Sequence, residues 1–307
     1  EEDLLAAIPL LPDQAEDYGR FDKGAARGIL TKFYLQTGRW QDCIDMANEV
    51  IDMGRFGLFD NYSDIFAFEN EGPGNIETVW VLPRALDLNH TSQFLHAFLF
   101  PNGFEPKSEN INEQDNVVFL KDEFVNSFDE NDERKELILT EYMLVGVEDA
   151  NGDKEVTDTD TVIVDGLGND KSIQNKWDND PNAFAWFHGN DVPEIRFADI
   201  LLSKAEALNE LGETSQALPL LNRVRERAGV DPLNISGQQE FRDAILEERL
   251  KEFFFEGKER DDLRRHGEFL DRARDRGITN VEECDLWFPV PQGEVDNNPN
   301  LDAIPCD

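Results

Sequence analysis

Apolar and polar residues alternate with helical spacing between residues 191 and 229, and this is the strongest structural signal in the chain. Apolar positions recur three and four residues apart in both halves, so each half is predicted to form a helix with one apolar face. These faces consist of Ala198, Leu201, Leu202, Ala205 and Leu208 in the first half and of Ala217, Leu218, Leu221 and Val224 in the second. The small residues let two helices approach closely, as in a tetratricopeptide-type hairpin.

The ends of these two helices are predicted from capping residues. Asp191 and Glu194 have the spacing of a capping box, and Pro193 between them suits the first helical turn, so we expect the first helix to begin there. Gly212 and Gly229 each follow an apolar run and suit the left-handed conformation that ends a helix.

A second stretch, residues 24–54, repeats the pattern around a turn glycine, Gly38. Cys43, Ala47 and Val50 lie at the same distances after Gly38 as three apolar residues lie after Gly212. The chain therefore contains two hairpins of one type. Because a free-standing helical repeat protein needs about three repeats, these two must pack on something else.

The remaining segments predict shorter elements. Runs of β-forming residues predict strands at 77–82, 137–147 and 161–164, the last two joined as a hairpin. Residues 117–135 predict a short helix, with its apolar side chains Phe119, Leu120, Phe124 and Phe128 pointing inward. Residues 238–267 predict one long helix, and the proline-rich tail from residue 286 is expected to run extended.

Together these elements predict a mostly α-helical fold with tetratricopeptide-like hairpins, inserted loops and short β-strands. We expect three regions. Residues 1–60 end an N-terminal helical-repeat region, residues 61–190 form a loop-rich insertion with short strands, and residues 191–307 form a C-terminal helical region with an extended tail.

The charge balance restricts the class of partner. The chain has 66 acidic and 29 basic residues and a net charge of −37, so nucleic acid and anionic membrane surfaces would repel it. The acidic residues are dispersed, which favours a surface adapted to high salt, where screening removes self-repulsion. No run of eighteen apolar residues predicts a membrane span, and the first residues lack the features of a signal peptide.

Thiols and acidic loops give no strong metal signal. The three cysteines match no zinc or redox spacing. Cys43 lies on a helix core face, whereas Cys284 and Cys306 flank the tail and form either a disulfide in an oxidising compartment or two free thiols. The acidic loop 149–160 invites a calcium-site interpretation, but Lys154 replaces the required glycine, so a solvated turn is favoured.

Four motifs occur in an order that is similar to that of the SusD/RagB family. They are IRFADILLSKAEALNELG, LLNRVRERAG, ILEERLKEFFFEGKERDDLRR and FPVPQGEVDNNPNL. The stretch 24–66 also resembles the preceding helical repeat of that family. The charged residues of the third motif are expected to form ion pairs that fix helix packing; they are Glu248, Arg249, Glu252, Arg260, Asp262 and Arg264.

The resemblance implies a location and partners. SusD/RagB proteins are lipid-anchored nutrient-binding proteins on the outer face of the bacterial outer membrane, where they cover a SusC-like TonB-dependent transporter. Family members begin with a signal peptide, a lipidated cysteine and further helices. We therefore expect this chain to start partway along a longer protein, with membrane attachment only through an anchor outside it.

Aromatic residues in polar loops are the candidate ligand contacts, because sugar rings stack on aromatic faces while their hydroxyls need polar partners. The loop 166–190 offers Trp177, Trp186, Phe187, Asn179 and Asn182, and the loop 84–112 offers His90, Phe100, Asn102 and Phe104. Trp177 and Trp186 are the first choices. The alternative is a structural role, in which a tryptophan in a loop packs on the protein body and holds the loop in place.

The predicted function is non-catalytic binding of a glycan or similar nutrient, without a cofactor. The sequence contains no GxSxG, HExxH or P-loop motif, so no enzyme chemistry is indicated. A peptide- or protein-binding helical-repeat scaffold is the alternative function, and a peptide is the alternative ligand.

Overall fold

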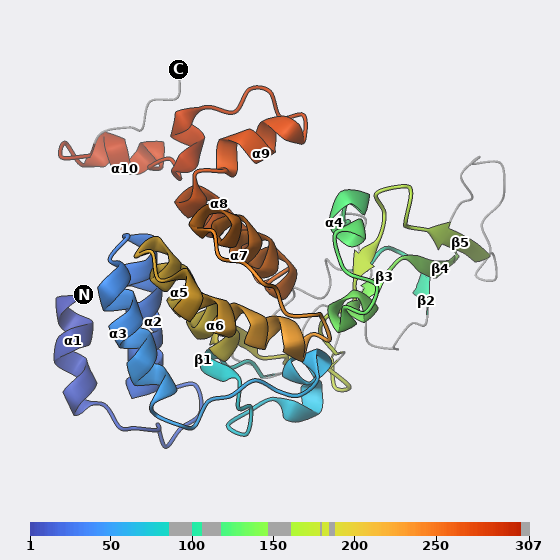
Figure 1. The fold of residues 1–307 in the computed structure, drawn as a ribbon. Coiled ribbons are helices and arrows are strands. Elements are labelled where there is room, and N and C mark those ends of the chain that lie inside the picture. The colour runs from blue at the N-terminus through green and yellow to red at the C-terminus, as the bar shows by residue number, and fades with distance from the viewer. Residues whose placement is uncertain (86–99, 106–117, 147–160, 179, 184–187, 302–307) are drawn as a thin grey trace. The chain divides into compact units, whose positions relative to one another are not determined.

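The computed structural model describes residues 1–85, 100–105, 118–146, 161–178, 180–183 and 188–301. The chain divides by compactness into two units, Glu1–Ile245 and Leu246–Asp307. Helices dominate both units, with short strands between the helical hairpins of the first (Figure 1). The predicted mostly helical class is thus confirmed, whereas the predicted region boundaries at residues 60 and 190 remain a division based on sequence pattern.

Two helical hairpins form the main layer of the first unit. Helices α2 (Lys23–Gln36) and α3 (Trp40–Ile51) pack together, as do α5 (Phe197–Glu210) and α6 (Thr214–Arg227), and α3 packs on α5 (Figure 1). Six of the predicted facing residues are fully buried, namely Cys43, Ala47, Val50, Ala217, Leu221 and Val224, whereas Leu218 is only half-buried. The hairpins therefore cover each other's apolar faces, as the repeat pattern requires.

The predicted start of the hairpin at Asp191 is wrong. Val192–Arg196 forms strand β7, which pairs antiparallel with β1 (Thr78–Leu82), and α5 begins only at Phe197. The Asp191 carboxylate accepts hydrogen bonds from the Tyr18 hydroxyl and from the backbone N–H of Gly72 and Arg84, so it does not cap a helix. Pairing with a distant strand has overridden a local capping signal.

Helix α2 lies close against this two-stranded sheet because of one glycine. A Cβ atom at Gly28 would lie 3.1 Å from a Val79 methyl on β1 and 3.4 Å from Ile195 on β7. The missing side chain therefore lets helix and sheet approach, which joins the first hairpin to the strand that precedes the second.

Two smaller sheets occupy the middle of the chain. Strand β4 (Glu141–Val145) pairs with β5 (Thr161–Asp165) and with β2 (Phe104–Glu105), and β3 (Ile138–Leu139) pairs with β6 (Ile173–Gln174). The predicted strand pair is confirmed. Helix α4 (Asp122–Asn126) lies in the predicted helical segment, and Phe128 just after it is buried as predicted. Phe119 precedes the helix and is exposed, against expectation.

The C-terminal helices differ from the prediction in two places. Helix α7 (Gln238–Glu252) ends before α8 (Glu259–His266) because Phe255 and Gly257 take positive φ values of 59° and 71°, which no helix accommodates. After α9 (Phe269–Asp275), the tail contains α10 (Gln292–Asn297) and is not wholly extended. The other helices among the described residues are α1 (Glu2–Ala7) and 3₁₀ turns at Ile8–Leu10, Tyr62–Ile65, Phe68–Asn70, Glu133–Leu137 and Glu283–Leu286.

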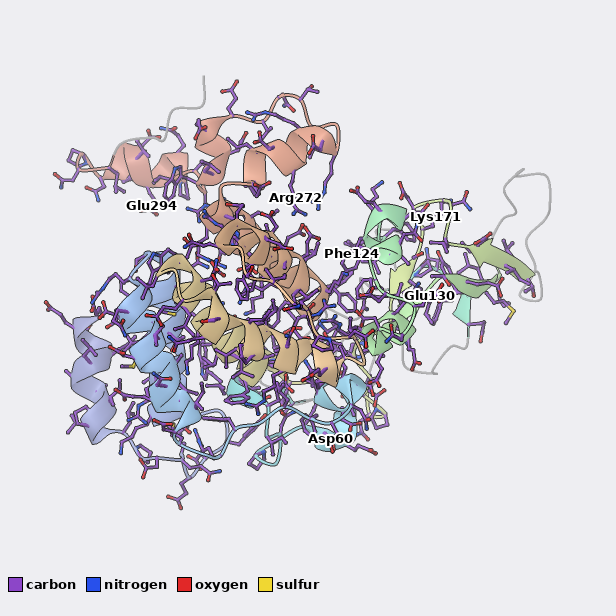
Figure 2. The ribbon with its side chains drawn as sticks, in the orientation of Figure 1. Asp60, Phe124, Glu130, Lys171, Arg272 and Glu294 are labelled. Carbon is purple, nitrogen blue, oxygen red and sulfur yellow. The ribbon has the colours of Figure 1, made fainter. Side chains whose placement is uncertain are left out.

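The acidic excess is carried on the surface. Exposed carboxylates occur in many segments, among them Asp60, Glu130 and Glu294, and the described side chains project outward from every layer (Figure 2). Among the described helices none is both long and apolar enough to cross a bilayer.

One buried carboxylate, that of Glu77, joins three elements of the first unit. Arg196 of β7 donates through Nη1 to Glu77 Oε1 at 2.6 Å, and Arg227 of α6 donates to Oε2 at 3.1 Å. The backbone N–H of Phe59 donates to the same oxygen at 3.2 Å. Glu77 is fully buried, so its charge is compensated by these two guanidinium groups and not by water.

We expect Glu77→Gln to lower the free energy of unfolding by about 3–5 kcal/mol, because it leaves two buried guanidinium groups without their counter-charge. Urea denaturation followed by circular dichroism measures this. The matched control is Glu49→Gln, which removes a half-exposed partner of Arg27 and should cost less than about 1 kcal/mol. Equal losses in the two variants would contradict the proposed anchoring role of Glu77.

Candidate functional site

A groove of the first unit lies between the segment 14–25, which leads into α2, and the segment 72–81, which leads into and forms most of β1. Arg55 and Phe56 also line it. The groove has a volume of about 360 Å³, which is within the usual range for ligand-binding clefts. Its walls come from segments far apart in sequence, which the β1–β7 pair and the packed α2 bring together.

The groove combines aromatic and hydrogen-bonding side chains. Trp80, Tyr18 and Phe56 line it, and the Trp80 ring is braced edge-on by Phe21, with 5.7 Å between ring centroids. The polar lining residues include Gln14, Glu16, Asp17, Arg20 and Asn75. Rings offer stacking faces and the polar groups offer donors and acceptors, so the lining suits a hydroxylated ligand with apolar faces.

Charged contacts hold one wall of the groove in place. Arg55 donates to Asp22 at 2.6 Å and lies over the Phe56 ring at 4.3 Å. The other oxygen of Asp22 accepts from the Ala25 N–H at 3.0 Å and caps α2. The aromatic ring, the helix cap and the ion pair thus form one connected wall, which is ordered before any ligand binds.

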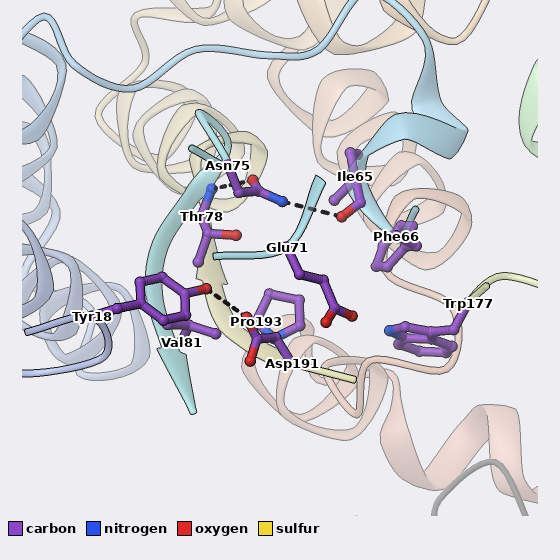
Figure 3. A pocket seen from close by; sticks show the side chains of 10 residues that line it. All are labelled: Tyr18, Ile65, Phe66, Glu71, Asn75, Thr78, Val81, Trp177, Asp191 and Pro193. Carbon is purple, nitrogen blue, oxygen red and sulfur yellow. Dashed lines mark hydrogen bonds between the residues drawn. The ribbon is translucent and has the colours of Figure 1, made fainter. Parts of the chain in front are cut away.

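A much smaller cavity (Figure 3) shares part of its lining with the groove. Tyr18, Asn75, Thr78 and Val81 line both spaces. The cavity has a volume of about 10 Å³, enough for one water molecule at most, so it cannot receive a sugar. The other lining residues are Ile65, Phe66, Glu71, Trp177, Asp191 and Pro193.

An acidic cluster fixes the shared wall of the two spaces. The Tyr18 hydroxyl donates to Asp191 Oδ2 at 2.7 Å, and the Asn190 amide donates to Glu71 Oε1 at 3.2 Å. Burial raises the pKa of Glu71 to about 8, and the neighbouring Asp191 and Asp180 carboxylates add to the shift. Burial and Asp191 also raise the pKa of the Tyr18 hydroxyl. Glu71 therefore holds its proton at neutral pH.

The structure places Trp177 in the wall of the small cavity, away from open solvent. Trp177 is only 9% exposed, and its ring meets Phe66 edge to face at 5.2 Å between centroids. The Lys176 ammonium lies over the Phe66 and Trp177 rings at 4.6 and 5.7 Å. This arrangement is that of a tryptophan which pins its loop to the protein body, and ligand contact by Trp177 stays a prediction.

The other predicted contacts divide into three groups. Phe100 and Phe104 are buried, with ring centroids 4.6 Å apart and Tyr142 beside Phe104, so they do not offer open stacking faces at the surface. Asn102 and Asn182 are exposed. The remaining four, His90, Asn179, Trp186 and Phe187, lie outside the described residues, and their predicted roles stay predictions.

The sequence analysis missed the groove residues, although one signal for them exists. Trp80 stands between Val79 and Val81 in a predicted strand, and both valines are buried. The pairing with β7 is irregular on either side of Trp80, and Trp80 stays half-buried between these two buried residues. A tryptophan with this placement is a candidate ligand contact even without a polar loop around it.

The structure tests only some of the predictions about metal sites and cysteines. Within the described ranges, no three potential metal ligands of the His, Cys, Asp or Glu type gather in one place. The loop 149–160, considered for calcium, and Cys306 lie outside these ranges. Cys43 is a buried thiol that donates to the Ser203 carbonyl at 3.7 Å, as its position on a helix core face predicts.

We expect Trp177→Ala to lower the free energy of unfolding by about 3–5 kcal/mol, because it leaves a large cavity beside Phe66. Trp177→Phe, which keeps a ring in place, should cost less. Urea denaturation of the three proteins measures the difference. If Trp177→Ala unfolds at the wild-type urea concentration, the ring does not pin the loop and the ligand-contact prediction gains support.

Glu71 should make the protein less stable as the pH rises. The folded protein retains a proton on Glu71 up to a pH of about 8, whereas the unfolded chain releases it near its ordinary pKa of 4.5. Stability from this group is therefore lost between these two pH values, by about 2 kcal/mol at most after solvent screening. Glu71→Gln should flatten this part of the urea-unfolding profile, and an unchanged slope would contradict the assignment.

Known proteins resemble the chain along nearly all of its length. It is 31% identical over 312 residues to SusD-like protein P25 of Formosa agariphila, covering 93% of this chain and 58% of that protein. It is 24% identical over 344 residues to the starch-binding protein SusD of Bacteroides thetaiotaomicron, covering 94% and 61%. The chain thus spans about six tenths of the length of these relatives.

The fold also matches solved structures. One is surface glycan-binding protein A from Bacteroides thetaiotaomicron in complex with laminarihexaose, with a TM-score of 0.75 and 20% identity over 98% of this chain and 68% of that one. At this identity the match establishes the fold alone. The sequence model of the SusD family matches residues 87–306. Since this match covers most of the chain and a relative agrees along 93% of it, the chain belongs to the SusD family.

Proposed function

We propose that the chain binds a glycan without converting it, and that the groove between residues 14–25 and 72–81 is a binding site. The groove carries this proposal, because it combines three aromatic rings with a set of hydrogen-bonding side chains in a preformed space of about 360 Å³. Similar proteins include one named starch-binding and one solved with laminarihexaose, which supports a glycan as ligand class.

Binding would divide between stacking and hydrogen bonding. A sugar ring places its C–H face on Trp80, which Phe21 braces from the side. Its hydroxyls meet Gln14 and Arg20 at the groove wall. The dispersed negative charge favours a neutral glycan over an acidic one, because like charges would repel an anionic polymer.

The wider role we propose follows from the family resemblance. A glycan captured at the outer face of the outer membrane would pass to a SusC-like TonB-dependent transporter, with the binding protein held by a lipid anchor outside this chain. The loops with Trp177, Trp186 and Phe187, and with His90 and Asn102, remain proposed as further contacts. Their mixture of rings and amides is of the same kind as that of the groove.

A second candidate function is peptide binding by the helical repeats. A groove of about 270 Å³ lies between α3, α5 and α6. Its lining mixes apolar and polar side chains, namely Gln41, Ile44, Asn48, Lys204, Leu208, Glu213, Gln216, Pro219 and Leu220. Such a surface suits an amphipathic helix. A binding screen should therefore include peptides as well as glycans.

Filling the groove should abolish glycan binding without unfolding the protein. Gly74 lines the groove, its φ is not positive, and a Cβ atom there meets nothing within 4 Å. We therefore expect Gly74→Trp to fold normally and to weaken binding at least about tenfold, or about 1.4 kcal/mol. Calorimetry with laminarihexaose and affinity gels with soluble starch, at low and at molar salt, measure this loss.

The matched control is Gly237→Trp, which adds the same bulk outside the groove, where a Cβ meets only Glu240 at an ordinary 3.5 Å. It should bind as the wild type does. Unchanged binding by Gly74→Trp would remove the groove from the proposal. Binding of a helical peptide, with no retention on either glycan, would favour the second candidate function.

A further inference from the structure

Two neighbouring aromatic side chains of the C-terminal unit stand out in solvent. Trp287 is 57% exposed and Phe288 is 76% exposed, in the segment between the 3₁₀ turn Glu283–Leu286 and α10. Most large side chains of the described residues lose far more of their surface on folding. Exposed rings of this size mark a binding surface more often than isolated exposed aliphatic residues do.

Each ring is held from one side by an arginine of α8. The Arg264 guanidinium lies over the Trp287 ring at 4.5 Å, and that of Arg260 lies over the Phe288 ring at 4.1 Å. Arg260 is fixed in turn, because its Nη2 donates to the Leu286 carbonyl at 3.1 Å. The rings are therefore positioned before a ligand arrives.

A carboxylate lies beside the two guanidinium groups. Asp261 is half-exposed and lies 3.9 Å from Arg260 and 3.6 Å from Arg264. A ligand with a strong charge of either sign would therefore meet a group of its own sign here. A neutral sugar meets an aromatic face together with guanidinium donors and a carboxylate acceptor, which are the partners that its C–H face and hydroxyls require.

We propose that Trp287 and Phe288, with Arg260 and Arg264 behind them, form a second carbohydrate-binding platform, specific for a neutral glycan. This inference rests on the proposed function and adds a site in a different unit from the groove. Two sites on one chain let a long polysaccharide bind more tightly than a short oligosaccharide, because the second contact becomes intramolecular.

The test compares a platform variant with a groove variant. Trp287→Ala/Phe288→Ala should fold as the wild type does, since both rings are exposed. It should reduce retention in native affinity gels of laminarin and of soluble starch about tenfold. The control is Ile278→Ala, a 53% exposed apolar residue of the same unit that contacts no such ring pair. Trp287→Tyr/Phe288→Tyr keeps two stacking faces and should restore most of the retention.

The outcomes separate the platform from the proposed function. Loss of retention in both the platform variant and Gly74→Trp supports two sites. Loss only in Gly74→Trp leaves the groove in place and overturns the platform. If the wild-type chain is retained by neither polysaccharide, the proposed function fails and the platform with it. Equal loss in Ile278→Ala would show a general surface effect and would also overturn the platform.

Discussion

The buried carboxylate of Glu77 is the interaction on which the first unit depends. It compensates the charges of Arg196 and Arg227, and so ties β1 to β7 and to the last turn of α6. A buried charge of this kind contributes little net stability over an apolar pair, but removing one partner is costly. It therefore specifies which strand pairs with which. The position of Trp80 and of the whole groove wall follows from that pairing.

The groove and the small cavity next to it share one wall. Tyr18 lines both, and its hydroxyl is held by Asp191, which also binds two backbone N–H groups. Glu71 stays protonated beside Asp191, so the two carboxyls need not both carry a charge in a space that admits one water molecule. Polar groups behind the wall order it, while the aromatic groups in front remain available to a ligand.

Arginine has two roles in this structure. Arg196 neutralises a buried acid, as Arg249 does in the C-terminal unit, whereas Arg260 and Arg264 lie over exposed rings. Arg249 of the third motif donates to Asp262 at 2.8 Å, and both are buried, as the predicted architectural role of these residues requires. In a chain with a net charge of −37, the arginines named here stand at sites of packing or of ring support.

The sequence by itself determined the helical hairpins, their glycine ends, the strand pair β4–β5 and the family, because helical and strand periodicities and motif order are local properties. It did not determine the start of α5, since Val192–Arg196 pairs with a strand more than a hundred residues away. The sequence also did not predict the break after α7, because no neighbouring residue indicates the positive φ of Phe255. The groove depended on tertiary structure alone. Its walls become neighbours only when β1 pairs with β7 and α2 packs on them, and no local pattern encodes such long-range contacts.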